Sequence, residues 1–273
     1  MSRLERRFAS LTQSGRRALV TFVTAGDPNL AATVPMMHGL VAGGADILEL
    51  GVPFSDPMAD GPVIQRASER ALAAGASLKK VLEQVRDFRR TDGDTPVVLM
   101  GYLNPFEAMG YSEFATQAAD AGVDGVLTVD LPPNEAEEFA VAMKASGVDC
   151  IFLVAPNSND ERITNICEKA SGFIYYVSLK GVTGSAHLDV ESVAERVQAI
   201  KAFTDLPVGV GFGIRDAESA ARVAQVSDAV VVGTAIVQRV EDLGARVEDI
   251  PDVLEQFVRE LRQAMDTATA QAA

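Results

Sequence analysis

The chain has 273 residues, 48% hydrophobic and 23% charged, which is the balance of an ordinary globular protein. Its formal net charge of −14 argues against nucleic acid and anionic membranes as partners, because both bind clustered Lys and Arg, but backbone amides could still hold a small phosphorylated substrate. No apolar run reaches the ~18 residues of a membrane helix, and no apolar signal segment follows the basic N-terminus. The two cysteines cannot form a disulfide framework. We therefore expect a cytoplasmic protein.

An amphipathic helix is predicted within residues 1–15, before the first strand. Ser2 and Glu5 match the capping-box pattern that begins many helices. Three apolar side chains then share one face: Leu4, Phe8 and Leu11. We expect this helix to cover the N-terminal mouth of a barrel.

Eight short apolar segments follow, each typical of a strand that is buried on both faces. They are residues 18–24, 46–51, 96–101, 125–129, 150–154, 173–178, 208–211 and 229–232. Amphipathic helices alternate with them, as in 78–85 after an N-cap at Ser77, 190–203 and 253–265. This alternation in a chain of one-domain size predicts a single α/β domain over 1–273, a (β/α)8 TIM barrel with an extra N-terminal helix. An open dinucleotide-binding sheet is disfavoured because no G-x-G-x-x-G follows the first strand. Residues 266–273 are expected to fray.

The second strand carries an acidic residue. Alternation in 46–51 places Glu49 on the face opposite to Leu48 and Leu50, and the leucine face suits the helix layer. Glu49 therefore points into the barrel mouth, where partial burial would raise its pKa toward acid–base use. A structural carboxylate bonded to a barrel neighbour is the alternative.

The segment after this strand, residues 51–62, contains three prolines, two glycines and two aspartates. Such a loop presents a carboxylate at low entropic cost. Asp56 precedes a proline and is a turn candidate. Asp60 precedes Gly61 and either caps the next helix or takes part in catalysis, and the local pattern does not decide between them.

Glycine clusters follow each of the last three strands, at residues 181–184, 211–214 and 233–234. Glycines let backbone N–H groups converge on an anion, and barrel enzymes often hold phosphate in the loops after strands seven and eight. The three clusters together predict a phosphate site.

Other polar residues give weaker signals. Periodicity does not decide whether Tyr175 or Tyr176 points inward. Lys180 could form a Schiff base, but it lies beyond the strand and is better explained as a solvated loop residue. His38 and His187 have no metal-ligand spacing, so no metal site is expected and His38 is assigned to packing.

Together these segments resemble the tryptophan synthase α subunit family in order and over nearly the whole chain. The matching stretches are residues 25–28, 49–57, 59–62, 181–184 and 211–214. The resemblance implies a carbon–carbon lyase that cleaves indole-3-glycerol phosphate to indole and glyceraldehyde 3-phosphate in tryptophan biosynthesis. It assigns Glu49 as general acid–base, Asp60 as acceptor of the indole N–H, and Tyr175 as a catalytic tyrosine.

The resemblance also implies binding residues and a partner. The phosphate residues are Gly184, Gly211, Gly213, Gly233 and Thr234, where Thr234 keeps the hydroxyl of the family's usual serine. The indole pocket is assigned to Phe22, Leu99, Tyr102, Leu127 and Phe212. The partner is a β subunit carrying pyridoxal phosphate in an α2β2 heterotetramer, facing residues 53–57 and 104–106, while this chain holds no cofactor. Residues 179–188 would act as a lid.

Three alternatives remain open at this stage. The chain could be another phosphate-binding barrel enzyme, such as a phosphosugar isomerase or a Schiff-base aldolase. It could be mainly an allosteric partner subunit, although intact Glu49, Asp60 and glycine loops argue against decayed catalysis. It could also be a lyase that acts alone.

Overall fold

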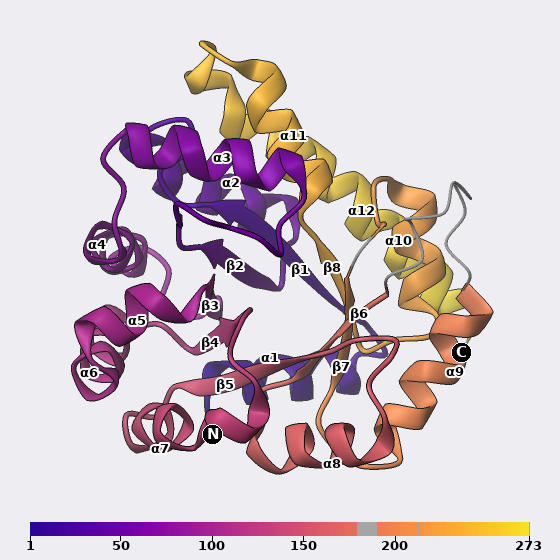
Figure 1. Ribbon diagram of the computed structural model, residues 1–273. Coiled ribbons are helices and arrows are strands. Elements are labelled where there is room, and N and C mark those ends of the chain that lie inside the picture. The colour runs from indigo at the N-terminus through magenta and orange to yellow at the C-terminus, as the bar shows by residue number, and fades with distance from the viewer. Residues whose placement is uncertain (179–189, 212, 273) are drawn as a thin grey trace.

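A computed structural model of the chain describes residues 1–178, 190–211 and 213–272. Its parallel strands close into a barrel in which each strand pairs with the next and β8 pairs with β1 (Figure 1). The strands are β1 (Ala18–Thr24), β2 (Ile47–Gly51), β3 (Val97–Gly101), β4 (Gly125–Thr128), β5 (Asp149–Val154), β6 (Ile174–Val177), β7 (Val208–Gly211) and β8 (Ala229–Val232). The predicted (β/α)8 barrel is confirmed, with strand ends shifted by one residue at several positions.

Helices surround the barrel and follow the predicted alternation (Figure 1). The α-helices are α1 (Arg3–Gln13), α2 (Thr33–Gly43), α3 (Pro62–Ala73), α4 (Leu78–Arg89), α5 (Leu103–Met109), α6 (Tyr111–Ala121), α7 (Glu137–Ala145), α8 (Asp160–Lys169), α9 (Val190–Lys201), α10 (Ala217–Ala224), α11 (Thr234–Leu243) and α12 (Ile250–Ala272). Short 3-10 turns are η1 (Leu30–Ala32), η2 (Pro133–Glu135) and η3 (Val247–Asp249). The Ser77 side chain caps α4 as predicted, by accepting from the Lys80 N–H. Within the described ranges, no helix combines the length and apolar character needed to cross a bilayer.

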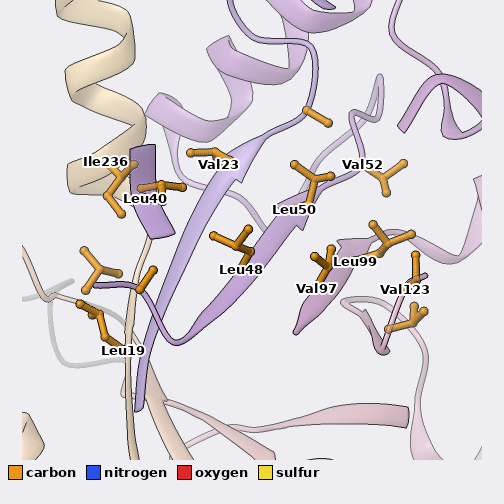
Figure 2. Close-up of a cluster of buried hydrophobic side chains, with 14 of the residues drawn as sticks. Leu19, Val23, Leu40, Leu48, Leu50, Val52, Val97, Leu99, Val123 and Ile236 are labelled. Atoms are coloured by element: carbon orange, nitrogen blue, oxygen red, sulfur yellow. The ribbon is translucent and has the colours of Figure 1, made fainter. Parts of the chain in front are cut away.

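The strands divide their side chains between two layers. Leu48 and Leu50 join the large cluster between strands and helices, which Figure 2 shows with Val97 and Leu99 in the same layer. Ile47 belongs instead to the cluster inside the barrel. The predicted direction of the alternation on β2 is therefore confirmed, and it puts Glu49 on the inner face.

Helix α1 closes the N-terminal end of the barrel. Its capping box between Ser2 and Glu5 is present as predicted. Leu4, Phe8 and Leu11 are buried among the inward side chains of the strands, and the Phe8 and Phe173 rings lie 5.8 Å apart. This end of the barrel is therefore filled by apolar side chains, which leaves the opposite end for polar groups.

The stretch 266–273, which is expected to fray, is helical in its described part, because α12 continues to Ala272. Asp266 accepts from Arg262 one turn earlier at 2.6 Å and from Arg16 at 3.1 Å. The Thr267 and Thr269 hydroxyls donate to carbonyl groups one turn back. These hydrogen bonds stabilise the last turns of α12, whose composition alone favours only a weakly stable helix.

A buried ion pair fastens α12 to the barrel. Arg262 Nη1 lies 3.0 Å from Asp46 Oδ2, which also accepts the Leu19 N–H, and both charged side chains are less than a tenth exposed. Arg262 also donates to the carbonyl of Arg17. One side chain thus joins α12 to the starts of β1 and β2.

We expect Arg262→Gln to destabilise the protein by about 3 kcal/mol, because it leaves the buried Asp46 carboxylate without its counter-charge. For a chain of this size Tm should fall by roughly 6–12 °C. Arg259→Gln on the same helix is the control, since Arg259 forms only an exposed pair with Glu255, worth at most about 1 kcal/mol. Equal Tm values for the two variants in thermal unfolding would contradict this account.

Candidate functional site

A pocket opens at the carboxyl ends of the barrel strands, where the active sites of such barrels lie. Its lining includes Phe22, Asp60, Ile64, Met100, Tyr102 and Val129. These residues come from β1, the segment before α3, α3 itself, β3 and the ends of β3 and β4. The pocket therefore combines an apolar wall with a carboxyl group and a phenol.

Glu49 lies on β2 beside this pocket, opposite Phe22 of β1 and Val98 of β3 in the strand register. It is 1% exposed, and its Oε1 has no hydrogen-bond partner in the described part of the chain. Burial, and secondarily the charge of Asp60, raises the pKa of Glu49 to about 8. At neutral pH Glu49 is a carboxylic acid that can donate a proton.

Asp60 is not a helix cap, so that alternative is wrong. The N-cap of α3 is Gly61, followed by Pro62 as the first helical residue. The Asp60 side chain turns instead toward Tyr102, whose hydroxyl donates to Oδ2 at 3.2 Å. Burial raises the pKa of Asp60 to about 6, partly offset by the Tyr102 hydrogen bond. Asp60 is therefore mostly ionised at neutral pH.

Tyr102 organises the segment that carries Asp60. Its hydroxyl accepts the N–H of Ala59 at 2.9 Å, and its ring stacks on Phe54 with centroids 5.1 Å apart. Burial and the nearby Asp60 charge raise the pKa of Tyr102 to about 12, so it remains a donor. The bond between Tyr102 and Asp60 does not follow from the sequence, which assigns Tyr102 only to the indole pocket, because the two residues are far apart in the chain.

Tyr175 points into the barrel, whereas Tyr176 packs in the outer layer, which resolves the choice that periodicity left open. A Cβ on Gly211 of β7 would lie only 2.3 Å from the Tyr175 hydroxyl oxygen. Position 211 must therefore be glycine for Tyr175 to keep this position. Burial, and then the charge of Glu49, raises the pKa of the Tyr175 phenol, so it stays protonated.

The structure describes four of the five predicted phosphate residues, and one of them, Gly211, ends β7. Gly233 and Thr234 stand at the start of α11, which has no side-chain cap on its N-terminal N–H groups. Gly213 is exposed and has a positive φ of 78°, which glycine adopts without strain. Gly184 lies outside the described residues, as do Lys180, His187 and the expected lid at 179–188.

Two of the residues assigned to the indole pocket, Leu99 and Leu127, do not line this pocket. Phe22 and Tyr102 line the pocket as expected, but Leu99 packs outward against the helix layer with Leu50 and Val97 (Figure 2). The next residue, Met100, takes the inner position. The register of β3 against β2, which pairs Gly51 with Met100, carries this information and the isolated β3 sequence does not.

Two other pocket assignments have different outcomes. Leu127 belongs to the cluster inside the barrel that contains Ile47, where it is completely buried below the pocket lining. Val129, two residues further on, lines the pocket instead. Phe212 lies outside the described residues. The sequence analysis missed Met100, Val129 and Ile64 as pocket residues.

A metal centre finds no support in the residues that the structure describes, where no three His, Cys, Asp or Glu side chains gather as ligands. The His38 ring packs at a tilt against Phe88, with ring centroids 4.8 Å apart, and contacts the Thr91 hydroxyl, as expected for a packing residue.

A family model described as "Tryptophan synthase alpha chain" matches residues 8–266. The chain belongs to the tryptophan synthase α chain family. Tryptophan synthase alpha chains of Thioalkalivibrio sulfidiphilus and Paraburkholderia phymatum are 61% and 59% identical to it, over 97% and 100% of this chain and 100% of each relative.

Solved structures of the family share this fold. The crystal structure of tryptophan synthase subunit alpha from Legionella pneumophila is 43% identical, with a TM-score of 0.92 over 98% of this chain and 99% of that chain. An aminoacrylate-bound tryptophan synthase from M. tuberculosis is 37% identical, with a TM-score of 0.86 over 97% of this chain and 100% of that chain.

In this α chain, Glu49→Gln should change stability in a pH-dependent way. The folded protein holds the Glu49 proton up to a pH of about 8, whereas the unfolded chain loses it near 4.5. Wild-type stability therefore falls as pH rises through this window, by up to about 1.4 kcal/mol per pH unit, and the neutral glutamine escapes this loss. Thermal unfolding at pH 5 and pH 8.5 should show similar Tm values at the lower pH and a higher Tm for the variant at the higher pH. A Tm difference that is the same at both pH values would show that Glu49 is not the buried acid described here.

Proposed function

We propose that this chain cleaves indole-3-glycerol phosphate to indole and glyceraldehyde 3-phosphate, as the α subunit of tryptophan synthase. The observation that carries the proposal is the buried, protonated carboxyl group of Glu49, whose Oε1 has no partner in the described residues, together with the ionised Asp60 in the pocket wall. Family membership supports it independently. The pair supplies an acid and an anion, and a retro-aldol cleavage of this substrate requires both.

In the proposed mechanism, Glu49 donates its proton to C3 of the indole ring, which leaves a positive charge delocalised to the ring nitrogen. The substrate hydroxyl then gives its proton to the Glu49 carboxylate as its C–O bond becomes a carbonyl. The carbon–carbon bond to C3 breaks and its electron pair restores the indole ring. Glu49 ends protonated, so the cycle closes without another reactant.

Asp60 would accept the indole N–H and stabilise the positive ring. A fixed carboxylate at the edge of an apolar pocket stabilises developing charge more strongly than water does, since it needs no reorganisation. Tyr102 fixes its orientation through the hydroxyl bond. Tyr175, whose buried phenol lies inside the barrel and stays protonated, would hold the reacting end of the substrate by a hydrogen bond.

The phosphate would bind at the start of α11, where the N–H groups and the helix dipole favour an anion. Gly233 and Thr234 stand at that start, Gly211 ends the adjacent strand β7, and Gly213 lies just after that strand. Gly184 completes the proposed set, and residues 179–188 would close over the substrate.

The proposal includes a partner and a compartment. A β subunit with pyridoxal phosphate would receive the indole, and this chain would need no cofactor of its own. The partner surface would include the loop of Asp56 and Pro57, whose tip at Met58 is 87% exposed. Phe106 does not belong to that surface, because it is fully buried against Phe114. Two free cysteines fit a reducing cytoplasm.

We expect Glu49→Gln and Asp60→Asn each to lower kcat/KM for indole release by ~10²-fold or more, since each removes a group that acts in the transition state. Asp87→Asn, an exposed carboxylate on α4, is the control and should retain wild-type activity. The assay follows indole formation from indole-3-glycerol phosphate with and without a tryptophan synthase β subunit, which should raise the wild-type rate. No indole from the wild type under either condition would overturn the proposal.

The pH profile of kcat/KM should be bell-shaped. Activity should rise through a pH of about 6 as Asp60 ionises and fall through about 8 as Glu49 loses its proton. Tyr102→Phe removes the bond that lowers the pKa of Asp60 and should shift the acidic limb to higher pH. Tyr111→Phe, on the outer helix α6, should leave both limbs in place. An acidic limb unchanged by Tyr102→Phe would remove Asp60 from its assigned role.

A further inference from the structure

Two helices hold opposite ends of the proposed substrate site. Asp60 lies just before α3, and the side chain of Gln65 in the first turns of α3 donates to the Asp60 carbonyl at 2.8 Å. Gly233 and Thr234 form the start of α11. The relative position of α3 and α11 therefore sets the distance between the indole end and the phosphate end of the site.

The inner side of the α3–α11 contact is part of the pocket wall. Ala67 of α3 and Val237 of α11 are buried together against Phe22 of β1. Ile64 and Met100 pack on the same small cluster and also line the pocket. A shift of α3 along α11 would therefore change the shape of the pocket.

The outer side of this contact is held by charge. Arg66 and Arg70, one turn apart on α3, both donate to Glu241 near the end of α11. Arg66 binds both carboxylate oxygens at 2.7 Å, and Arg70 Nη1 binds one of them at 2.7 Å. These two arginines hold the pKa of Glu241 at about 2, so the anion persists throughout the physiological range.

Arg70 also reaches a third element. Its Nε and Nη2 bind the two carboxylate oxygens of Asp27 at 2.8 and 2.9 Å. Asp27 is 1% exposed and lies in the turn after β1. The neighbouring Gly26 packs closely against the loop between α3 and α4, since a Cβ there would lie 2.8 Å from Ala76, and its N–H donates to the Thr33 hydroxyl. Arg70 thus joins α3, α11 and the β1 turn with one planar group.

We propose that Arg70 is a positioning residue that sets the distance between the indole-binding end and the phosphate-binding end of the site. The inference rests on the proposed function for the identity of the two ends. A guanidinium donates in fixed directions from one plane, so it holds both carboxylates at one mutual position, which the single ammonium of lysine does not do. A residue of merely structural importance would lower stability without distinguishing ligands that span the site from ligands that fill one end.

The distinguishing measurement compares one spanning ligand with its two halves. A non-cleavable indole joined to phosphate by a three-carbon chain gains affinity from simultaneous binding at both ends, and this gain disappears when the ends are out of register. Indole alone and glycerol 3-phosphate alone each contact one end and are insensitive to the separation.

In the experiment, dissociation constants of these three ligands are measured for the wild type, Arg70→Lys, Glu241→Gln and Arg90→Lys. We expect Arg70→Lys to weaken the spanning ligand by ~10-fold or more, with the halves within about twofold and kcat/KM for indole release falling in parallel. Glu241→Gln weakens the link to α11 without disturbing the Arg70–Asp27 contact, so it should lower the affinity for the spanning ligand by a smaller factor. This variant replaces Arg70→Lys as the test if Arg70→Lys does not fold. Arg90→Lys is the control, because Arg90 at the end of α4 forms an exposed ion pair with Asp87. Its three dissociation constants should match those of the wild type.

The outcomes separate the two proposals. The positioning role would be overturned if a variant lost equal affinity for the spanning ligand and for its halves. It would also be overturned if neither Arg70→Lys nor Glu241→Gln lost affinity for the spanning ligand. A wild-type protein that releases no indole would overturn the proposed function, whereas the ligand comparison requires no catalysis and tests the geometry alone.

Discussion

The structure around the pocket depends on the burial of one carboxyl group. Glu49 is on the inner face of β2, where it is only 1% exposed, and its Oε1 finds no partner in the described residues. An ionised carboxylate in such a place costs several kcal/mol, so the group avoids that cost by keeping its proton. The raised pKa of Glu49 is therefore a direct consequence of the side-chain alternation on β2 that also packs Leu48 and Leu50 against the helices.

Favourable packing elsewhere in the barrel offsets the free-energy cost of burying this carboxyl group. The N-terminal end of the barrel is filled by apolar side chains from α1 and the strands, and the buried Asp46 at that end is paired with Arg262. The opposite end holds Glu49, whose Oε1 has no partner in the described residues. Stability is thus concentrated at one end of the barrel, and reactive groups at the other, which is where barrel enzymes place their chemistry.

Much of this organisation follows from local sequence, and the exceptions share one cause. The eight strands and the inward direction of Glu49 follow from apolar runs and alternation alone. Leu99 was assigned to the wrong face because the sequence of β3 does not reveal its register with β2. Asp60 remained ambiguous because its partner Tyr102 follows a different strand. The helical tail was missed since Asp266 is held in part by Arg16, at the other end of the chain. In each case the deciding contact joins residues that are distant in sequence.

The two carboxyl groups of the site separate in pKa because their surroundings differ, although both are desolvated. Asp60 retains a donor, the Tyr102 hydroxyl, and some exposure, whereas Glu49 is almost fully buried, its Oε1 has no partner in the described residues, and the Asp60 charge further disfavours its ionisation. Ionising Asp60 first makes ionising Glu49 harder, so between a pH of about 6 and about 8 the pair holds one proton, and it resides on Glu49. A retro-aldol cleavage through a protonated indole needs that distribution, an acid toward C3 and an anion toward the ring nitrogen. Gly211 contributes by leaving room for Tyr175, so the phenol occupies the inner face near Glu49 without displacing the acid. The assignment of roles thus follows from which group is more deeply buried and which has a donor.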